Sequence, residues 1–389
     1  MLVFILTLSS VQAGIVSVVE TCRHGARAPV DSHYWDTGYW NQGLGELTQE
    51  GMRQHYFNGA EFRNRYIINT PVFGPNYITN QIYVRSTDYN RTIMSAQSQL
   101  MGLFPLGPSL SSAAMMQKAV PPISVQNNAS IINSLGMQAL PNYFSPVPVH
   151  VVALPYDHML YGYNSKVCPY FNVITKLVQQ TAEYQFRVTN YTNYLQKQLY
   201  GIFGQVIDYE TAGWYADNLI CDAFHGYPWP EGMTQNIYEQ MTGIMNYSNS
   251  YIFNYTGAYL ASSQFYSQVL SIFNGVISGT STVKFGYFSA HDTTLIGFLT
   301  AINNFNGQNP PFASTLIFEL IDESGEYYVN VKYNDQPLTI NGCQIPCPFD
   351  SFQAYLNSWI ITDVVKACQI SSLTDTSGTL ENHFINRST

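Results

Sequence analysis

The sequence predicts an α/β fold: a central, mainly parallel sheet flanked by helices, with a smaller, mostly helical cap domain inserted. Two observations predict it. Three apolar runs typical of buried strands each lead, through a polar turn, to reactive side chains. This rhythm disappears over residues 108–255, where Pro-rich loops and helix-like stretches replace it. Repeated strand, turn and helix units bring the carboxyl ends of their strands to one edge of a sheet, where such folds bind ligands.

The three strand-to-turn units position the reactive residues. Strands are predicted at 15–21, 81–84 and 283–289, and the turns after them hold Arg23 and His24, then Arg85, then His291 and Asp292. Helices over 90–104 and 294–302 follow the second and third strands, and Ser86 or Thr87 is expected to cap the former. Helix amino-termini at this edge would point backbone N–H groups at an anion.

The remaining elements complete the division into domains. A further helix is predicted within 47–66, helix-like sequence covers 171–199, and 315–321 with 327–333 form a hairpin around residues 323–326. A chain of 389 residues without a long linker predicts one compact body with an insertion. The expected catalytic domain comprises residues 14–107 and 256–370, and the cap comprises residues 108–255.

Both ends of the chain differ from the rest. Residues 1–13 carry an apolar run that ends in Val11-Gln12-Ala13, which is typical of a signal peptide, although Lys and Arg are missing before the run. The alternative is a buried first strand. Residues 371–389 are rich in Ser, Thr and Asn and are expected to be disordered. No later segment is long and apolar enough for a transmembrane anchor.

The charge balance excludes nucleic acid as a partner. The net charge is −9 and the isoelectric point is near 5.3, whereas binding to a phosphate backbone needs clustered Lys and Arg. Charged residues make up only 11% of the chain. An acidic protein that still gathers several arginines around one point would create a local anion pocket.

Cysteines and glycosylation sequons suggest an exported protein, in the secreted fraction or the lysosomal lumen. Six cysteines are first read as disulfide partners, and Cys343 and Cys347 are close enough to close a small loop, but spacing leaves the pairing open. A zinc site is disfavoured, because no second pair of ligands has matching spacing. Sequons occur at Asn90, Asn128, Asn190, Asn246, Asn254 and Asn386. Asn90 is expected to be unmodified, since a glycan there would crowd the site.

The densest chemical signal is the run that holds Arg23, His24 and Arg27. Guanidinium groups bind phosphate bidentately, and neighbouring cations disfavour the protonated imidazole, which keeps a ring nitrogen free to attack phosphorus. Taken singly, each arginine is best interpreted as a surface charge and the histidine as a loop residue. The three together favour an anion-binding site. Cys22 is a rival nucleophile, yet the protein tyrosine phosphatase device needs five residues between Cys and Arg. Only four separate Cys22 from Arg27, so Cys22 is interpreted as a buried thiol.

The ordered motifs resemble those of the histidine acid phosphatases. The family's R-H-G-x-R-x-P motif is complete as residues 23–29, an R-S-T-D segment stands at 85–88 with Arg91-Thr92 after it, and a late His-Asp pair stands at 291–292. The resemblance implies a phosphoglycerate mutase-like fold with His24 as the phosphorylated nucleophile and Asp292 as the general acid. It assigns the phosphate to Arg23, Arg27, Arg85 and His291. It also implies the disulfides Cys168–Cys368 and Cys343–Cys347, which leave Cys22 and Cys221 free.

The function expected from these residues is an acid phosphatase that acts on small phosphomonoesters without a metal or other cofactor. A phytase-like enzyme is an alternative, but 16 Lys and Arg residues are few for a multiply charged ligand. A phosphate-binding pseudoenzyme is opposed by the intact set of reactive residues, and a structural glycoprotein would leave the three reactive strand ends unexplained. The family makes a homodimer plausible, and the natural substrate stays open.

Overall fold

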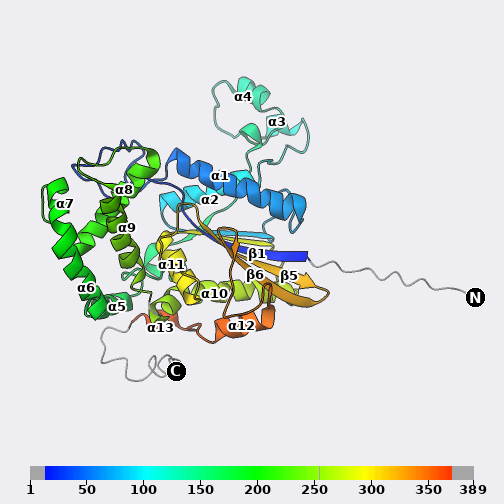
Figure 1. Ribbon diagram of the computed structural model, residues 1–389. Helices are drawn as coiled ribbons and strands as arrows, with labels where there is room; N and C mark the ends of the chain where they lie inside the picture. The colour runs from blue at the N-terminus through cyan, green and yellow to red at the C-terminus, as the bar shows by residue number, and fades with distance from the viewer. Residues whose placement is uncertain (1–13, 254, 370–389) are drawn as a thin grey trace, which may run out of the picture.

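The structure is a computed structural model that describes residues 14–253 and 255–369 (Figure 1). The predicted signal peptide, the predicted disordered tail, Asn254 and Asn386 therefore lie outside the described residues. Within the described part, none of the helices is both long and apolar enough to cross a membrane.

A mixed sheet forms the centre of the molecule, and the predicted α/β class is confirmed. In the described part its strand order is β3-β2-β4-β1-β5-β6-β7, with β8 paired to β6. The strands are β1 (Gly14–Arg23), β2 (Ile82–Thr87), β3 (His150–Val152), β4 (Phe285–Ala290), β5 (Thr315–Glu323), β6 (Glu326–Tyr333), β7 (Gln336–Pro337) and β8 (Cys347–Pro348). The first four strands are mutually parallel, and the later ones pair antiparallel. Strands β5 and β6 form the predicted hairpin.

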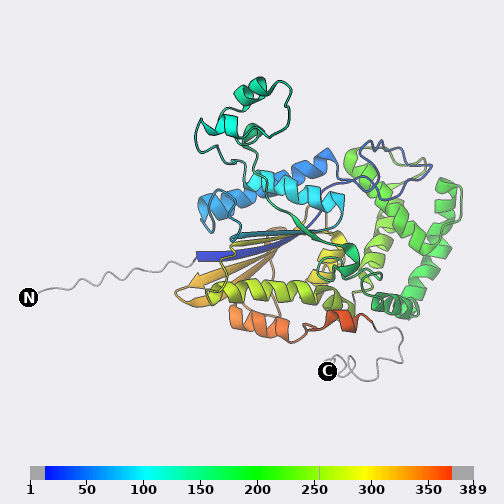
Figure 2. The same ribbon diagram turned by 180° about the vertical axis from the view of Figure 1, so that it is seen from behind.

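Helices cover both faces of this sheet, as Figures 1 and 2 show from opposite sides. One face packs against α1 (Gln49–Arg63) and α2 (Asn90–Leu103), and the other against α10 (Tyr255–Ile277), α11 (Asp292–Ala301), α12 (Phe349–Asn357) and α13 (Val364–Ala367). The helices α1 and α2 touch backbone to backbone, because a Cβ at Gly59 or Gly102 would collide with the main chain of the other helix. This close packing anchors the start of α2 beside the strand ends.

A separate helical lobe stands beside the carboxyl edge of the sheet. It contains α5 (Tyr170–Gln179), α6 (Ala182–Asn190), α7 (Gln196–Phe203), α8 (Tyr209–His225) and α9 (Gln235–Ser250). The core shared by α6 to α9 also includes Trp35, from the loop that follows β1. The helix-like stretch 171–199 is thus divided among several helices, and the loop after β1 packs with them.

The range 108–255 is not uniformly a helical cap. Strand β3 lies inside this range, yet it pairs parallel with β2 at the edge of the central sheet. The short helices α3 (Met115–Lys118) and α4 (Asn128–Leu135) form a projection away from the body, and none of their residues is buried (Figure 1). Residues 108–255 thus include an edge strand and a projection in addition to the helical lobe. Sequence patterns missed β3 because a three-residue strand is too short to show alternation.

Two helix starts also differ from the expectation. Helix α2 has Tyr89 as its N-cap without a side-chain cap bond, so the predicted caps Ser86 and Thr87 were wrong; both lie within β2. Helix α11 begins at Asp292 and is capped by His291, two residues before the predicted start. The reactive pair is thus part of the helix terminus itself.

Two disulfides are present in the described part of the chain. Cys168, just before α5, is bonded to Cys368, just after α13, and Cys343 is bonded to Cys347. Cys22 and Cys221 are free and buried.

Candidate active site

A cavity of about 380 Å³ lies between the carboxyl edge of the sheet and the helical lobe. Its wall on the sheet side includes His24, Arg27, Arg91, His291 and Asp292, and its wall on the lobe side includes Glu210, Trp214, Asp217, Met245 and Tyr251. The sheet register explains the first group, because parallel pairing places Arg23 at the end of β1 directly beside Ala290 at the end of β4. Arg23 and Ala290 are 267 positions apart in the sequence, yet they lie side by side at the same edge of the sheet.

His24 is held with one ring nitrogen free. Its side chain is almost fully buried, and Nδ1 donates a hydrogen bond to the carbonyl oxygen of Gly25 at 2.9 Å. A neutral ring that carries its proton on Nδ1 keeps a lone pair on Nε2. Burial, together with the positive charges of Arg91, Arg23 and Arg27, holds the pKa of His24 well below its ordinary value. The lowered pKa favours the neutral imidazole over the protonated one.

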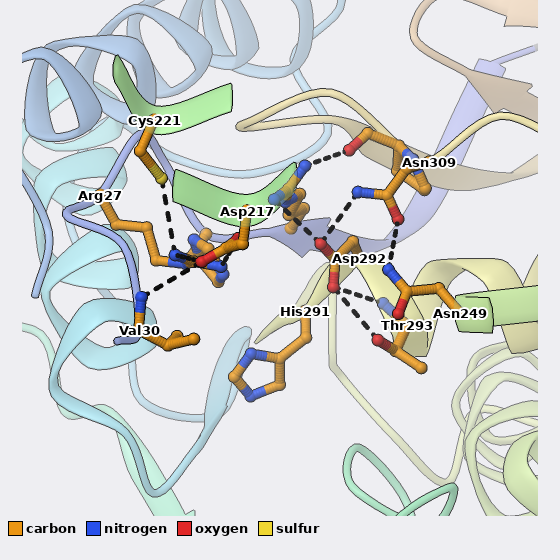
Figure 3. Close-up of polar contacts among 12 residues, drawn as sticks. Arg27, Val30, Asp217, Cys221, Asn249, His291, Asp292, Thr293 and Asn309 are labelled. Carbon is orange, nitrogen blue, oxygen red and sulfur yellow. Dashed lines mark hydrogen bonds and ion pairs between the residues drawn. The ribbon is translucent and has the colours of Figure 1, made fainter. Parts of the chain in front are cut away.

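Arg23 forms an ion pair with Asp292, which lines the cavity. Arg23 Nη2 lies 2.9 Å from Asp292 Oδ2. Asn309 donates to the same oxygen at 3.1 Å (Figure 3). The other oxygen accepts from the backbone N–H of Thr293 at 2.8 Å. Burial alone would raise the pKa of Asp292, but Arg23, Arg27 and these hydrogen bonds outweigh it and hold the pKa well below its ordinary value. Asp292 is thus ionised as long as this pair persists.

Arg27 is fixed by the helical lobe. Its Nη1 and Nη2 donate to the two carboxylate oxygens of Asp217 on α8, at 3.0 and 2.8 Å (Figure 3). Asp217 also accepts from the backbone N–H of Val30 at 3.1 Å. This bidentate contact sets the direction of the guanidinium and joins the lobe to the loop after β1 that holds His24 and Arg27. No local sequence pattern predicted that Asp217 contacts Arg27, because only the fold brings α8 close to this loop.

Arg85, which was predicted to bind phosphate, does not line this cavity. Its Nη2 lies 2.5 Å from Oδ1 of the buried Asp157, and its Nη1 contacts Met159 Sδ at 3.5 Å. The prediction assumed that the strand ends before Arg85, whereas β2 continues to Thr87. A side chain inside the strand extends from the sheet rather than from its end, so Arg85 is withdrawn from the phosphate site.

Arg91, unlike Arg85, lines the cavity. It lies in the first turn of α2, lines the cavity, and packs its guanidinium over the Tyr89 ring at 4.4 Å. No ion pair of Arg91 is found among the described residues, in contrast to Arg23, Arg27 and Arg85. Its position just after a strand-to-helix turn is the sequence signal that could have identified it.

His291 faces His24 across the site. The two rings are 5.6 Å apart and nearly perpendicular, and His291 Nε2 shares a hydrogen bond with Thr87 Oγ1 at 3.0 Å. Burial and the surrounding arginines lower the pKa of His291 well below its ordinary value. A phosphoryl oxygen that bound His291 at Nε2 would have to replace Thr87.

Other predicted or excluded residues lie behind or beside the cavity. Cys22 contacts Tyr287, and burial raises the pKa of its thiol to about 12, which makes it a poor nucleophile. His225 bonds Thr48 Oγ1 at 2.9 Å and does not line the cavity. The amide of Asn90 donates to Glu46 at 3.0 Å. Among residues 14–253 and 255–369, no cluster of three His, Cys, Asp or Glu side chains is arranged to hold a metal ion.

Comparisons with known proteins show the family to which this chain belongs. Residues 15–334 match the model of the histidine phosphatase superfamily (branch 2). The lysosomal acid phosphatase of Homo sapiens is 30% identical over 366 residues, covering 90% of this chain and 79% of the relative. The prostatic acid phosphatase of Homo sapiens is 30% identical over 368 residues, covering 90% of this chain and 86% of the relative.

A solved structure shares the fold at lower identity. The phytase of Klebsiella sp. ASR1 superposes with a TM-score of 0.62 at 17% identity, over 91% of this chain and 98% of that chain. Together with the family match, the fold and the relatives identify the chain as a phosphatase that belongs to the histidine phosphatase superfamily, branch 2.

Proposed function

We propose that this phosphatase hydrolyses small phosphate monoesters in acid, through a phosphohistidine on His24, with Asp292 as general acid. The observation that carries the proposal is the free Nε2 of a neutral, buried His24, which opens into a cavity lined by Arg27 and Arg91. In the first step Nε2 attacks phosphorus, the bond from phosphorus to the ester oxygen breaks, and the carboxyl group of Asp292 protonates the leaving alkoxide. In the second step water attacks phosphorus, gives its proton to Asp292, and releases phosphate and His24.

Charge stabilisation in this proposal comes from arginine. Arg23, Arg27 and Arg91 would hold the three non-bridging oxygens, with His291 beside them. Phosphoryl transfer mainly requires positioning and stabilisation of negative charge, which fixed cations can supply. The pairs of Arg27 with Asp217 and of Arg23 with Asp292 keep both cations in position before the substrate arrives.

The ion pair of Asp292 connects the mechanism to acid pH. Asp292 cannot act as an acid while Arg23 holds it ionised. When the phosphate replaces Asp292 as the partner of Arg23, its negative charge also lies near Asp292. Both changes raise the pKa of the Asp292 carboxyl. A phosphomonoester has its second pKa at about 6, so in acid the substrate arrives as a monoanion with one proton to spare. We propose that Asp292 receives this proton and returns it to the leaving group.

The test is hydrolysis of p-nitrophenyl phosphate across pH in the presence of EDTA. His24→Ala should abolish turnover, while His150→Gln, at an exposed position of β3, should retain it. Acid quenching would destroy a phosphohistidine, whereas alkaline quenching should trap it on the wild-type enzyme. Turnover that survives the loss of His24, or that requires a metal, would refute the proposal.

We also propose a secreted or lysosomal location. The disulfides and the apolar run at 2–8 support it, together with the lysosomal name of one relative. Sequencing the amino-terminus of the protein recovered from the medium or from lysosomes of expressing cells tests this proposal. Cleavage after Ala13 is expected, and an intact Met1 in the cytosol would contradict it.

A further inference from the structure

Besides Asp217, the lobe wall of the cavity contains acidic and aromatic side chains that have no role in the proposed mechanism. Glu210, Gly213, Trp214 and Asp217 are spaced by three and four positions along α8, so they share one face of this helix, and all four line the cavity. Asp217 is at the phosphate end of that face, because it holds Arg27. Glu210 is two turns away, about 10 Å along the helix axis at 1.5 Å per residue.

Glu210 is a carboxylate without a cationic partner. Its Oε1 accepts from the hydroxyl of Tyr184 at 2.8 Å, and its Oε2 accepts from Ser248 at 3.0 Å. No ion pair of Glu210 is found within the described part of the chain, and Arg187 is paired with Glu183 at 2.9 Å. The first turn of α8 also favours a negative charge. The side chain is thus fixed by two hydroxyl groups, and its charge is left for the cavity.

Aromatic rings stand beside this carboxylate. Trp214 is 63% exposed, and Tyr251 lines the same wall from the end of α9. A carboxylate beside aromatic faces is the arrangement that binds ammonium and guanidinium groups. A second phosphate or a carboxylate at the same place would instead be repelled.

The charges of the whole cavity support this reading. Arg27, Arg91 and the adjoining Arg23 contribute three positive charges, and Glu210, Asp217 and Asp292 contribute three negative ones. At the phosphate end Asp292 and Asp217 offset Arg23 and Arg27, so Arg91 leaves a net positive charge there, whereas Glu210 is the negative charge at the lobe end. A ligand with many phosphates does not match this distribution, whereas a ligand with one phosphate and a distant cation does.

We infer that Glu210 is a specificity-determining residue that selects phosphate monoesters whose alcohol part ends in a cationic group. The separation of that group from the phosphate should be of the order of the ~10 Å between Asp217 and Glu210 along α8. This inference rests on the proposed function, since it assumes that phosphate binds at Arg27 and Arg91. An aromatic ring with a short aminoalkyl chain spans such a distance and places its ring between the walls that Trp214 and Tyr251 contribute.

The experiment compares 4-(2-aminoethyl)phenyl phosphate with 4-(2-carboxyethyl)phenyl phosphate. The two esters have similar leaving groups and differ in the charge at the far end. For the wild-type enzyme, kcat/KM should be at least about tenfold higher for the amine, given the Coulomb energy of a partly buried pair. Glu210→Gln keeps an acceptor oxygen for one of the two hydroxyl groups of Tyr184 and Ser248 and offers an N–H donor to the other. It should bring the ratio close to one, and Glu210→Lys should invert it.

Controls separate this inference from the proposed function. Glu183→Gln removes a carboxylate from the same lobe that does not line the cavity, so it should keep the wild-type ratio. Raising the salt concentration should lower the ratio of the wild-type enzyme by screening, which needs no variant. A wild-type ratio near one, or a ratio unchanged by Glu210→Gln, would overturn the role of Glu210. Failure to turn over p-nitrophenyl phosphate would instead overturn the proposed function.

Discussion

At the scale of single residues, Arg85 and Arg91 are only six positions apart but have different environments. Arg85 is paired with the buried Asp157, and Arg91 lines the cavity without a carboxylate partner among the described residues. Arg91→Ala should therefore lower kcat/KM by about 10²–10³-fold, as loss of one transition-state donor typically does. Arg85→Ala should mainly destabilise the fold, by about 3 kcal/mol, because Asp157 is left buried and unpaired. Kinetics and thermal unfolding of both variants test this, and the reverse pattern would restore Arg85 to the phosphate site.

Asp292 should matter in proportion to the difficulty of the leaving group. Asp292 is the first residue of α11, and it lines the cavity. Asp292→Asn should reduce kcat/KM for glycerol 2-phosphate by about 10²–10⁴-fold, because an alkoxide needs a proton to leave. p-Nitrophenyl phosphate should lose less, since p-nitrophenolate leaves without help. Equal losses for the two esters would remove Asp292 from the role of general acid.

Asn309 adjusts the same carboxyl through one hydrogen bond. Asn309 Nδ2 donates to Asp292 Oδ2, which is one of the contacts that lower the pKa of Asp292 (Figure 3). Without this donor the pKa of Asp292 should rise. The protonated carboxyl, and the activity that depends on it, should then persist to higher pH. The alkaline limb of the profile of kcat against pH should therefore move upward in Asn309→Ala. A limb that stays in place or moves to lower pH would contradict the assignment.

At the scale of elements, β1 positions the catalytic loop through a buried polar network. His55 on α1 donates from Nε2 to the backbone carbonyl of Arg23 at 3.1 Å, and its Nδ1 contacts Gln99 at 3.1 Å. Gln99 on α2 in turn donates to Glu20 of β1 at 2.6 Å. Both helices thus contact β1, the strand that leads into His24. Their packing therefore determines where the loop with His24 begins.

Glu20 makes this network sensitive to pH. Burial raises the pKa of its carboxyl well above the ordinary value, although the bond from Gln99 acts in the opposite direction. A raised pKa means that the folded state favours the protonated acid, so its contribution to stability is present in acid and is lost as pH rises through the folded-state pKa. Glu20→Gln should therefore increase stability more at pH 7.5 than at pH 4.5. Thermal unfolding at both pH values tests this, and an equal change at the two would contradict it.

At the scale of the whole molecule, one disulfide constrains far more chain than the other. Cys168–Cys368 spans a sequence separation of 200, and Cys343–Cys347 spans 4. The loop-entropy model assigns about 5 kcal/mol to the former and about 2 kcal/mol to the latter. Replacing both cysteines of the long-range bond by Ala should lower the unfolding temperature much more than the same change at 343 and 347. Similar shifts for the two double variants would argue against the entropic account.

The arrangement of lobe and sheet explains how the cavity is completed. The sheet edge contributes the proposed nucleophile and acid, while α8 contributes Asp217, Glu210 and Trp214. The loop after β1 packs Trp35 into the lobe core, so the catalytic loop and the lobe are joined by continuous chain as well as by the contact of Arg27 with Asp217.

The sequence by itself determined the α/β class, the hairpin and the cluster of Arg23, His24 and Arg27. These features are local: strand periodicity, turn composition and residues within one short loop are encoded in neighbouring positions. The motif at 291–292 was likewise readable, because it follows an apolar strand directly.

Only the tertiary structure decided which arginine completes the site and what surrounds the phosphate. The end of β2 lies three residues beyond its predicted position, which places Arg85 inside the sheet and Arg91 at the cavity. Strand β3 was missed because its pairing with β2, rather than its three residues, defines it. Asp217 and Glu210 are far from His24 in sequence, and no local pattern distinguishes them from surface acids. Their roles depend on the packing of α8 against the carboxyl edge of the sheet.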